Sequence, residues 1–233
     1  NINGSLTIDA GATLAVVGGG YIVTAKSNVV NNGKITSSGG FFIFKGANIT
    51  NNDSIRGSNV YFDSTNFLSG AGAYTSSNIT IRNTGNVLLS ANVTFSPTSS
   101  FIINFGGTLN PNTRTFTFNS GSFYAYSGST VTSSGIFQTR NNVNIYIKSG
   151  SVFNATFKVN TGTATSNDDG SPFIADYRGS ITVDAGATLT TQGGGYANRA
   201  YGTVINNGTI SGNNFIKKGG LLTNNANIAP ANL

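Results

Sequence analysis

The sequence predicts an all-β protein folded as a parallel β-helix, or β-solenoid, of about ten coils with almost no helix. Three observations predict this fold. Short runs that alternate between apolar and small polar residues fill the chain, glycine and asparagine separate these runs, and one block of sequence occurs twice. Alternation with a period of two is the pattern of a half-buried strand. Self-similarity at a fixed spacing is the mark of a repeat architecture.

The alternating runs are too short for a meander of long hairpins. None of them carries an apolar stripe of helical period over three turns, so we expect strands and not helices. A solenoid coil of about 20–25 residues, with three short strands and three turns, would accommodate them. The runs lie at residues 6–8, 13–16, 21–23, 29–30, 41–44, 60–62, 79–81, 87–89, 93–95, 101–103, 116–118, 123–126, 143–147, 152–153 and 157–159.

The breaks between the runs are rich in asparagine and glycine, which supply the left-handed backbone conformations that sharp turns require. In a solenoid, asparagines at equivalent turns of successive coils can form ladders of hydrogen-bonded amides. One aspartate precedes Ala-Gly in both copies of the repeated block, and we interpret it as closing a turn by bonding nearby backbone amides. The predicted turn residues are Asp9, Asn32, Gly33, Asp184, Asn207 and Gly208.

The duplicated block covers residues 4–36 and 179–211, at a constant offset of 175 residues. Both copies contain the phrase Asp-Ala-Gly-Ala-Thr-Leu, then Gly-Gly-Gly-Tyr, then Asn-Asn-Gly. At the expected coil length the offset corresponds to about seven or eight coils. We therefore expect residues 1–233 to form a single β-solenoid domain, with similar cross-sections at its two ends. The polar stretch near 165–178 contains Gly and Pro and is expected to leave the solenoid as a loop.

The composition restricts the classes of function. Only 9% of the residues are charged, and there is no Cys, His, Met, Trp or Glu, so a thiolate metal site and a disulfide framework are excluded. No stretch approaches the about 18 consecutive apolar residues of a membrane helix. The missing initial Met fits either a mature chain whose leader has been removed or a segment cut from a longer protein. The net charge is +6, but the basic residues are scattered. This argues against nucleic-acid binding and favours at most weak attraction to polysaccharides or anionic surfaces.

Two groups of residues are the candidates for chemistry. Asp168 and Asp169 could begin a calcium loop, but no spaced acid follows to complete the oxygen shell that calcium requires. Asp176 and Arg178 come nearest to the acidic and basic groups of a polysaccharide lyase or glycoside hydrolase. Because acid–base groups are so few, we predict no catalytic residue, no metal site and no cofactor. A carbohydrate-degrading enzyme is the rival hypothesis.

The phrases Gly-Ser-Leu-Thr-Ile-Asp-Ala-Gly-Ala-Thr-Leu and Val-Ile-Asn-Asn-Gly-Thr-Ile resemble the repeats of bacterial autotransporter passengers and filamentous-haemagglutinin-like adhesins. The resemblance covers the two copies of the block, and the rest of the chain agrees with these families only in texture. It implies a right-handed parallel β-helix displayed outside the cell, which is the handedness we expect here.

The expected function is that of a non-enzymatic, extracellular structural protein, a subunit or segment of a bacterial surface filament or adhesin. A solenoid has unpaired strand edges at both ends, and such edges pair with other chains, so we expect head-to-tail self-association. A carbohydrate-binding or carbohydrate-degrading β-helix is the alternative, with a surface polysaccharide as the partner. The residues expected at the assembling ends are Leu6, Ile8, Leu221, Leu222 and Ile228.

Overall fold

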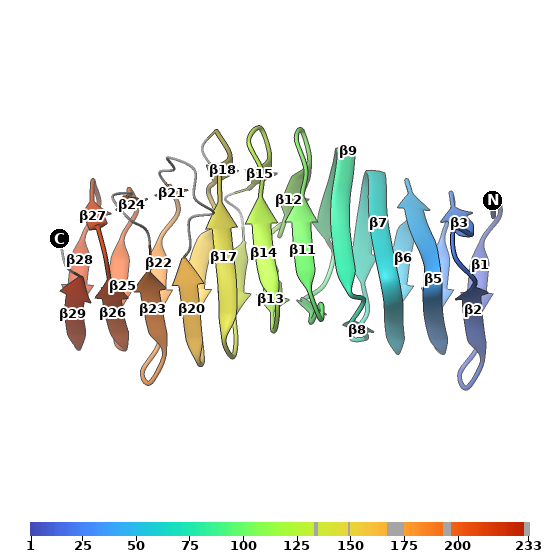
Figure 1. Cartoon of the computed structure of the whole chain (residues 1–233), viewed down its shortest axis with the longest axis horizontal. Coiled ribbons are helices and arrows are strands. Elements are labelled where there is room, and N and C mark those ends of the chain that lie inside the picture. The colour runs from blue at the N-terminus through green and yellow to red at the C-terminus, as the bar shows by residue number, and fades with distance from the viewer. Residues whose placement is uncertain (133–134, 149, 167–174, 193–196, 231–233) are drawn as a thin grey trace.

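The computed structural model describes residues 1–132, 135–148, 150–166, 175–192 and 197–230. It confirms the predicted fold class: the described residues contain no helix, and their parallel strands stack as a β-solenoid of about ten turns. The strands follow one another along a rod, with the N-terminus at one end and the C-terminus at the other (Figure 1). With no helix in this part of the chain, none is available to span a membrane.

The strands form three faces, each a ladder of parallel strands from successive turns. The first face consists of β1 (Leu6–Ile8), β4 (Val29–Asn31), β6 (Asn48–Asn51), the ends of β7 (Ser54–Ser69) and β9 (Asn78–Leu89), β12 (Thr108–Asn110), β15 (Thr130–Val131), β18 (Val152–Phe153), β21 (Ala175–Tyr177), β24 (Asn198–Ala200) and β27 (Phe215–Lys217).

The second face consists of β2 (Thr13–Val17), the start of β5 (Lys34–Lys45), the start of β7, β8 (Ala73–Tyr74), β10 (Val93–Phe95), β13 (Thr115–Phe118), β16 (Ile136–Thr139), β19 (Thr156–Val159), β22 (Ile181–Val183), β25 (Val204–Asn206) and β28 (Leu222–Asn224). The third face consists of β3 (Ile22–Ala25), the end of β5, the middle of β7, the start of β9, β11 (Ser100–Ile103), β14 (Ser122–Ala125), β17 (Val143–Ile147), β20 (Thr163–Ser166), β23 (Thr188–Thr191), β26 (Thr209–Gly212) and β29 (Asn227–Pro230).

The core is built from ladders of like side chains, because each inward residue lies next to the inward residue of the following turn. On the second face, Phe116 pairs with Phe137 in register, and Phe137 pairs with Phe157. All three are fully buried, and the first two rings stack with centroids 5.0 Å apart. Stacked rings of this kind add to the free energy gained by removing their apolar area from water.

Strands β5, β7 and β9 are longer than the sequence predicts, since β5 and β9 each continue round one corner of the solenoid and β7 continues round two. Irregular register between Ser37 and Phe41 and between Asp63 and Thr65 marks two of these corners. Residue Ser64 at the second corner has a positive φ of 60°, a conformation that bends the strand without ending its pairing.

The Asn-Asn-Gly turns confirm the predicted amide ladders. In the first copy Asn31 is buried and its Nδ2 donates to Oδ1 of Asn51 at 2.7 Å, one turn further along. In the second copy Asn206 donates to Asn224 at 2.8 Å. The adjacent, outward asparagines repeat the arrangement, with bonds from Asn52 to Asn32 and from Asn225 to Asn207.

The two copies of the duplicated block lie on different faces of the solenoid. The ladder from β1 through β4, β6, β7, β9, β12, β15 and β18 to β21 spans eight turns, and β22 follows on the next face. Leu6 therefore lies on the first face, whereas Ile181, its counterpart in sequence, lies on the second. The offset is eight turns plus one face, close to the seven or eight coils that we expected, and the additional face rotates the second copy relative to the first.

The segment 165–178, which we expected to form a loop, includes strand residues at both of its ends. Thr165 and Ser166 belong to β20, and residues 175–177 form β21, so both flanks are part of the ladder. Residues 167–174 lie outside the described residues.

Candidate functional site

The predicted turn residues lie at corners where successive turns touch. The backbone carbonyls of Asp9 and Asp184 accept hydrogen bonds from the amides of Ala12 and Ala187, each at 3.0 Å. The turn is thus closed by the main chain. The carboxylate of Asp184 instead contacts the preceding turn, where it accepts from Asn160 at 2.8 Å and pairs with the Lys158 ammonium at 3.1 Å.

The residues weighed as a metal or catalytic site fall into different surroundings. Asp168 and Asp169 lie outside the described residues. The part of the chain that is described has no group of three or more His, Cys, Asp or Glu side chains that could hold a metal. Asp176 points outward from β21 and its carboxylate accepts a two-pronged ion pair from Arg199 on the next turn, at 2.7 and 3.0 Å. Arg178 follows the strand and is exposed.

Tyr177, between these two residues, points into the core, where its hydroxyl lies 2.8 Å from the Ser166 hydroxyl. Ser166 in turn donates to Asn198 at 2.6 Å. Burial raises the pKa of Tyr177 well above the ordinary range of a phenol. The segment 176–178 therefore contributes an ion pair to the surface and a polar cluster to the core.

The residues expected at the assembling ends divide into two sets. Leu6, Ile8 and Ile228 pack against the core. Leu221 and Leu222, on the last turn, are 73% and 41% exposed. Three other large apolar side chains are exposed on the first turn, namely Val17, Tyr21 and Ile22.

A surface that the sequence analysis did not single out lies where the third face turns into the first. We call it the aromatic corner: Phe105, Tyr124, Tyr126 and Tyr146. The Tyr124 and Tyr146 rings, on adjacent turns, stack with centroids 4.5 Å apart and planes 7° apart. Tyr124 also stacks on Tyr126 at 6.1 Å. Lys148 lies over the same surface, with its Nζ 5.7 Å from the centroid of Tyr126.

The signal for this surface is present in the sequence. In Phe123-Tyr124-Ala125-Tyr126, alternation places Phe123 and Ala125 inward and the two tyrosines outward. Aromatic residues at outward positions of a strand are not needed for the core, so they point to a role at the surface. Which turns bring them together could not be read from the spacing, since the length of a turn varies along the chain.

The aromatic corner contains a hollow of about 550 Å³, lined by Thr84, Asn104, Phe105 and Tyr126. These residues come from three successive turns: Thr84 from β9, Asn104 and Phe105 from the corner after β11, and Tyr126 from the corner after β14. Volumes of this size are typical of small-molecule sites. The described lining combines two aromatic rings with an amide and two hydroxyl groups, and it includes no carboxylate.

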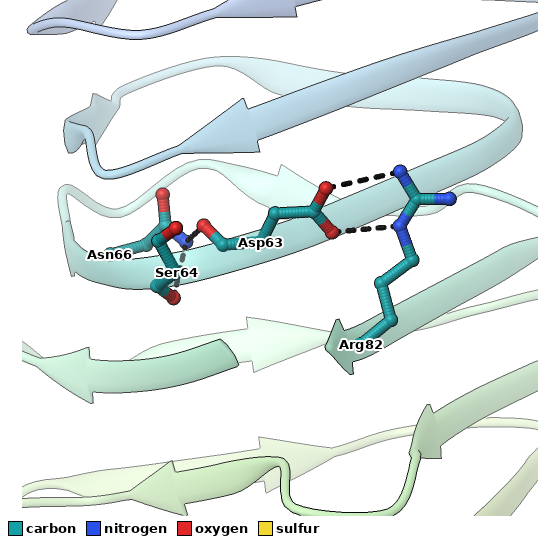
Figure 2. Close-up of polar contacts among 4 residues, drawn as sticks. All are labelled: Asp63, Ser64, Asn66 and Arg82. Atoms are coloured by element: carbon teal, nitrogen blue, oxygen red, sulfur yellow. Dashed lines mark hydrogen bonds and ion pairs between the residues drawn. The ribbon is translucent and has the colours of Figure 1, made fainter. Parts of the chain in front are cut away.

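An ion pair lies beside the hollow, because Arg82 precedes the lining residue Thr84 by two positions on β9. Arg82 donates to both carboxylate oxygens of Asp63, at 2.7 and 3.1 Å, while Asn66 donates to the backbone carbonyls of Asp63 and Ser64 (Figure 2). The hydrogen bond to Asp63 raises the pKa of Arg82, whose guanidinium also lies 4.1 Å from the centroid of the Tyr61 ring. The charge of Arg82 is therefore already paired with that of Asp63.

Comparison with protein-family models, with curated proteins and with solved structures finds no match for this chain. Its functional assignment rests on the fold and on the surfaces described above.

Proposed function

We propose that this protein is a non-enzymatic structural rod of a bacterial cell surface, a subunit or segment of an extracellular filament or adhesin that assembles by end-to-end stacking. The observation that carries the proposal is the continuous parallel ladder on all three faces of the solenoid. Such a ladder is stiff, because each turn is hydrogen-bonded to its neighbours along the whole rod. A stiff rod of this kind suits a structural protein that extends over a distance and makes contacts with other molecules along its sides.

The polarity of the ladder supports stacking. The strand pairs of the described residues are all parallel, from β1–β4 at one end to β26–β29 at the other. The free edge of the first turn and the free edge of the last turn are therefore complementary halves of the same hydrogen-bond pattern. Exposed apolar side chains lie on the first and last turns, including Val17 and Tyr21 at one end and Leu221 and Leu222 at the other. A head-to-tail contact of this kind does not close on itself and yields open filaments.

One side chain limits the strength of that contact. Lys217 on β27 occupies the inward position of the ladder, next to Ala200, and its Nζ is buried with no hydrogen-bond partner among the described residues. Burial lowers the pKa of Lys217. An inward-pointing charge is a common means of restricting the pairing of an edge strand.

The test is the dependence of mass on protein concentration, measured by sedimentation and light scattering, with negative-stain microscopy of the same samples. We expect the chain to form stacks that lengthen with concentration. Lys217→Leu should lengthen them, because it removes the buried charge, and Leu222→Lys should shorten them, because it adds a charge to the same turn. A monomer of about 24 kDa at every concentration in all three proteins would refute stacking.

The non-enzymatic part of the proposal has its own test. The protein is incubated with acidic and neutral polysaccharides, with Asp176→Ala and Arg178→Ala as variants. We expect no cleavage by any of the three. Turnover that either variant abolishes would show that the protein is a carbohydrate-degrading enzyme.

A further inference from the structure

We propose that the hollow at the aromatic corner binds a neutral hexose glycan. The site would give the proposed rod a ligand. The inference rests on the proposed function only in one respect, namely that the protein meets the glycan at a cell surface. The residues that would contact it are Thr84, Asn104, Phe105 and Tyr126.

Phe105 is the platform of this site. It is 76% exposed, the largest exposed fraction among the large apolar residues of the described chain. Its ring lies against Gly128 on the next turn. The contact is so close that a Cβ added at Gly128 would lie 2.6 Å from Cδ2 and Cε2 of the ring. The ring is therefore supported by the backbone of a neighbouring turn while most of its surface faces water. An unpacked aromatic side chain of this kind contributes little to the core and is typical of a binding surface.

The polar groups around the ring select the kind of ligand. No hydrogen bond joins the Asn104 amide or the Thr84 hydroxyl to another described side chain or backbone group, so both are available to a ligand. An apolar peptide covering the hollow would leave them buried and unsatisfied, which costs free energy. A hexose meets both requirements, because its C–H face can stack on an aromatic ring while its hydroxyl groups exchange hydrogen bonds with amides and hydroxyls.

The charges around the hollow favour a neutral glycan. The four described lining residues are uncharged, and Arg82, two positions before Thr84 on β9, is paired with Asp63. Lys148 is buried, and its ammonium group lies within cation–π distance of the Tyr126 and Tyr146 rings. An acidic glycan or a single-stranded nucleic acid would instead require a groove of several basic residues along its backbone.

The experiment is affinity electrophoresis of the full chain through gels that contain a neutral glucan, mannan or galactan, followed by calorimetry with oligosaccharides of whichever glycan retards it. We expect Phe105→Ala to weaken binding about tenfold or more. Phe105→Leu, which keeps an apolar side chain but removes the ring, should have a similar effect. Asn104→Ala should weaken binding by a smaller factor. The control is Tyr201→Ala, which removes an exposed aromatic residue, 39% exposed, outside the hollow.

Three outcomes would overturn the inference: no retardation by any neutral glycan, equal binding by Phe105→Ala and Tyr201→Ala, or binding only to acidic polymers that salt abolishes. Thermal unfolding of each variant monitors folding, and exposed Phe105 can be replaced without opening a core cavity. Failure here is distinguishable from failure of the rod proposal. Rods that stack but ignore glycans refute only the glycan site, and monomers that bind a neutral glycan refute only the stacking.

Discussion

At the scale of single residues, two buried tyrosines differ in whether their hydroxyl groups are satisfied. Tyr74 and Tyr177 are each 1% exposed and both stack on phenylalanine rings of the core. The Tyr177 hydroxyl bonds Ser166, whereas the Tyr74 hydroxyl has no partner among the described residues. A buried hydroxyl without a hydrogen-bond partner destabilises the folded state, whereas a hydroxyl that is hydrogen-bonded within a network stabilises it.

This difference predicts opposite effects of the same substitution. Tyr74→Phe should leave the free energy of unfolding unchanged or raise it by up to about 1 kcal/mol, because it removes an unsatisfied hydroxyl and keeps the ring. Tyr177→Phe should lower it by about 1 kcal/mol, because Ser166 loses a partner. Urea unfolding of the two variants beside the wild type measures both. A loss of stability in Tyr74→Phe as large as that in Tyr177→Phe would contradict the assignment.

The same residues predict how stability depends on pH. Burial raises the pKa of both phenols in the folded chain, while in the unfolded chain they ionise near pH ~10. Their contribution is thus complete below that pH and is lost as the pH rises above it, because only the unfolded state releases the proton. We expect the urea midpoint to decrease as the pH is raised from neutral to strongly alkaline. The decrease should be smaller in Tyr74→Phe than in the wild type. An equal decrease of the urea midpoint with pH in the wild type and in Tyr74→Phe would refute this expectation.

At the scale of the element, the Asn-Asn-Gly turn is explained residue by residue. The first asparagine continues a buried amide ladder and the second an exposed one. The glycine then passes over the preceding turn: a Cβ at Gly33 would lie 2.3 Å from the Ala12 carbonyl oxygen and 2.4 Å from that of Asp9. Gly208 has the same two distances, to Ala187 and Asp184.

Replacement of these glycines should therefore be costly because of contact with the backbone. Gly33→Ala or Gly208→Ala should lower the free energy of unfolding by about 1–3 kcal/mol, the usual range for overpacking. Gly4→Ala is the matched control, since nothing lies within 4 Å of its added methyl group. Thermal unfolding separates the three. An equal change in melting temperature for Gly4→Ala and Gly33→Ala would show that close packing of the turns is not the cause.

At the scale of the whole molecule, the solenoid behaves as a stack of turns in which each turn contacts only its neighbours. Ser54 lies in register with Ala73, one turn later on the second face. Deletion of residues 54–72 therefore removes one full turn and joins strands that already occupy the same face. The stability of such stacks is close to a sum over turns and interfaces.

We expect the chain lacking residues 54–72 to keep a β-type circular dichroism spectrum and a cooperative transition, with a moderately lower melting temperature. Deletion of 54–63 alone removes about half of the same turn, which moves the following strands to the wrong face and turns their core residues outward. That variant should unfold or aggregate. Similar stability of the two deletion variants would mean that the faces are not specified by register.

The sequence by itself determined the parallel β-solenoid and the amide ladders. These follow from local rules: alternation with a period of two, turn residues at the breaks, and a block that recurs. Asn31 and Asn206 form the same hydrogen bonds in both copies, so the amide ladders could be predicted without coordinates. Gly33 and Gly208 instead lie against the backbone of the preceding turn and do not have the left-handed conformation that the sequence predicted for turn glycines.

Only the tertiary structure decided which residues meet across the turns. The lengths of successive turns differ, and their sum places the second copy one face further round the solenoid, a shift that no local pattern encodes. For the same reason, Asp176 meets Arg199, and residues Thr84, Phe105 and Tyr126, from three different turns, surround one hollow. A strand reveals which of its residues point outward, but the accumulated register of the whole chain decides what lies beside them.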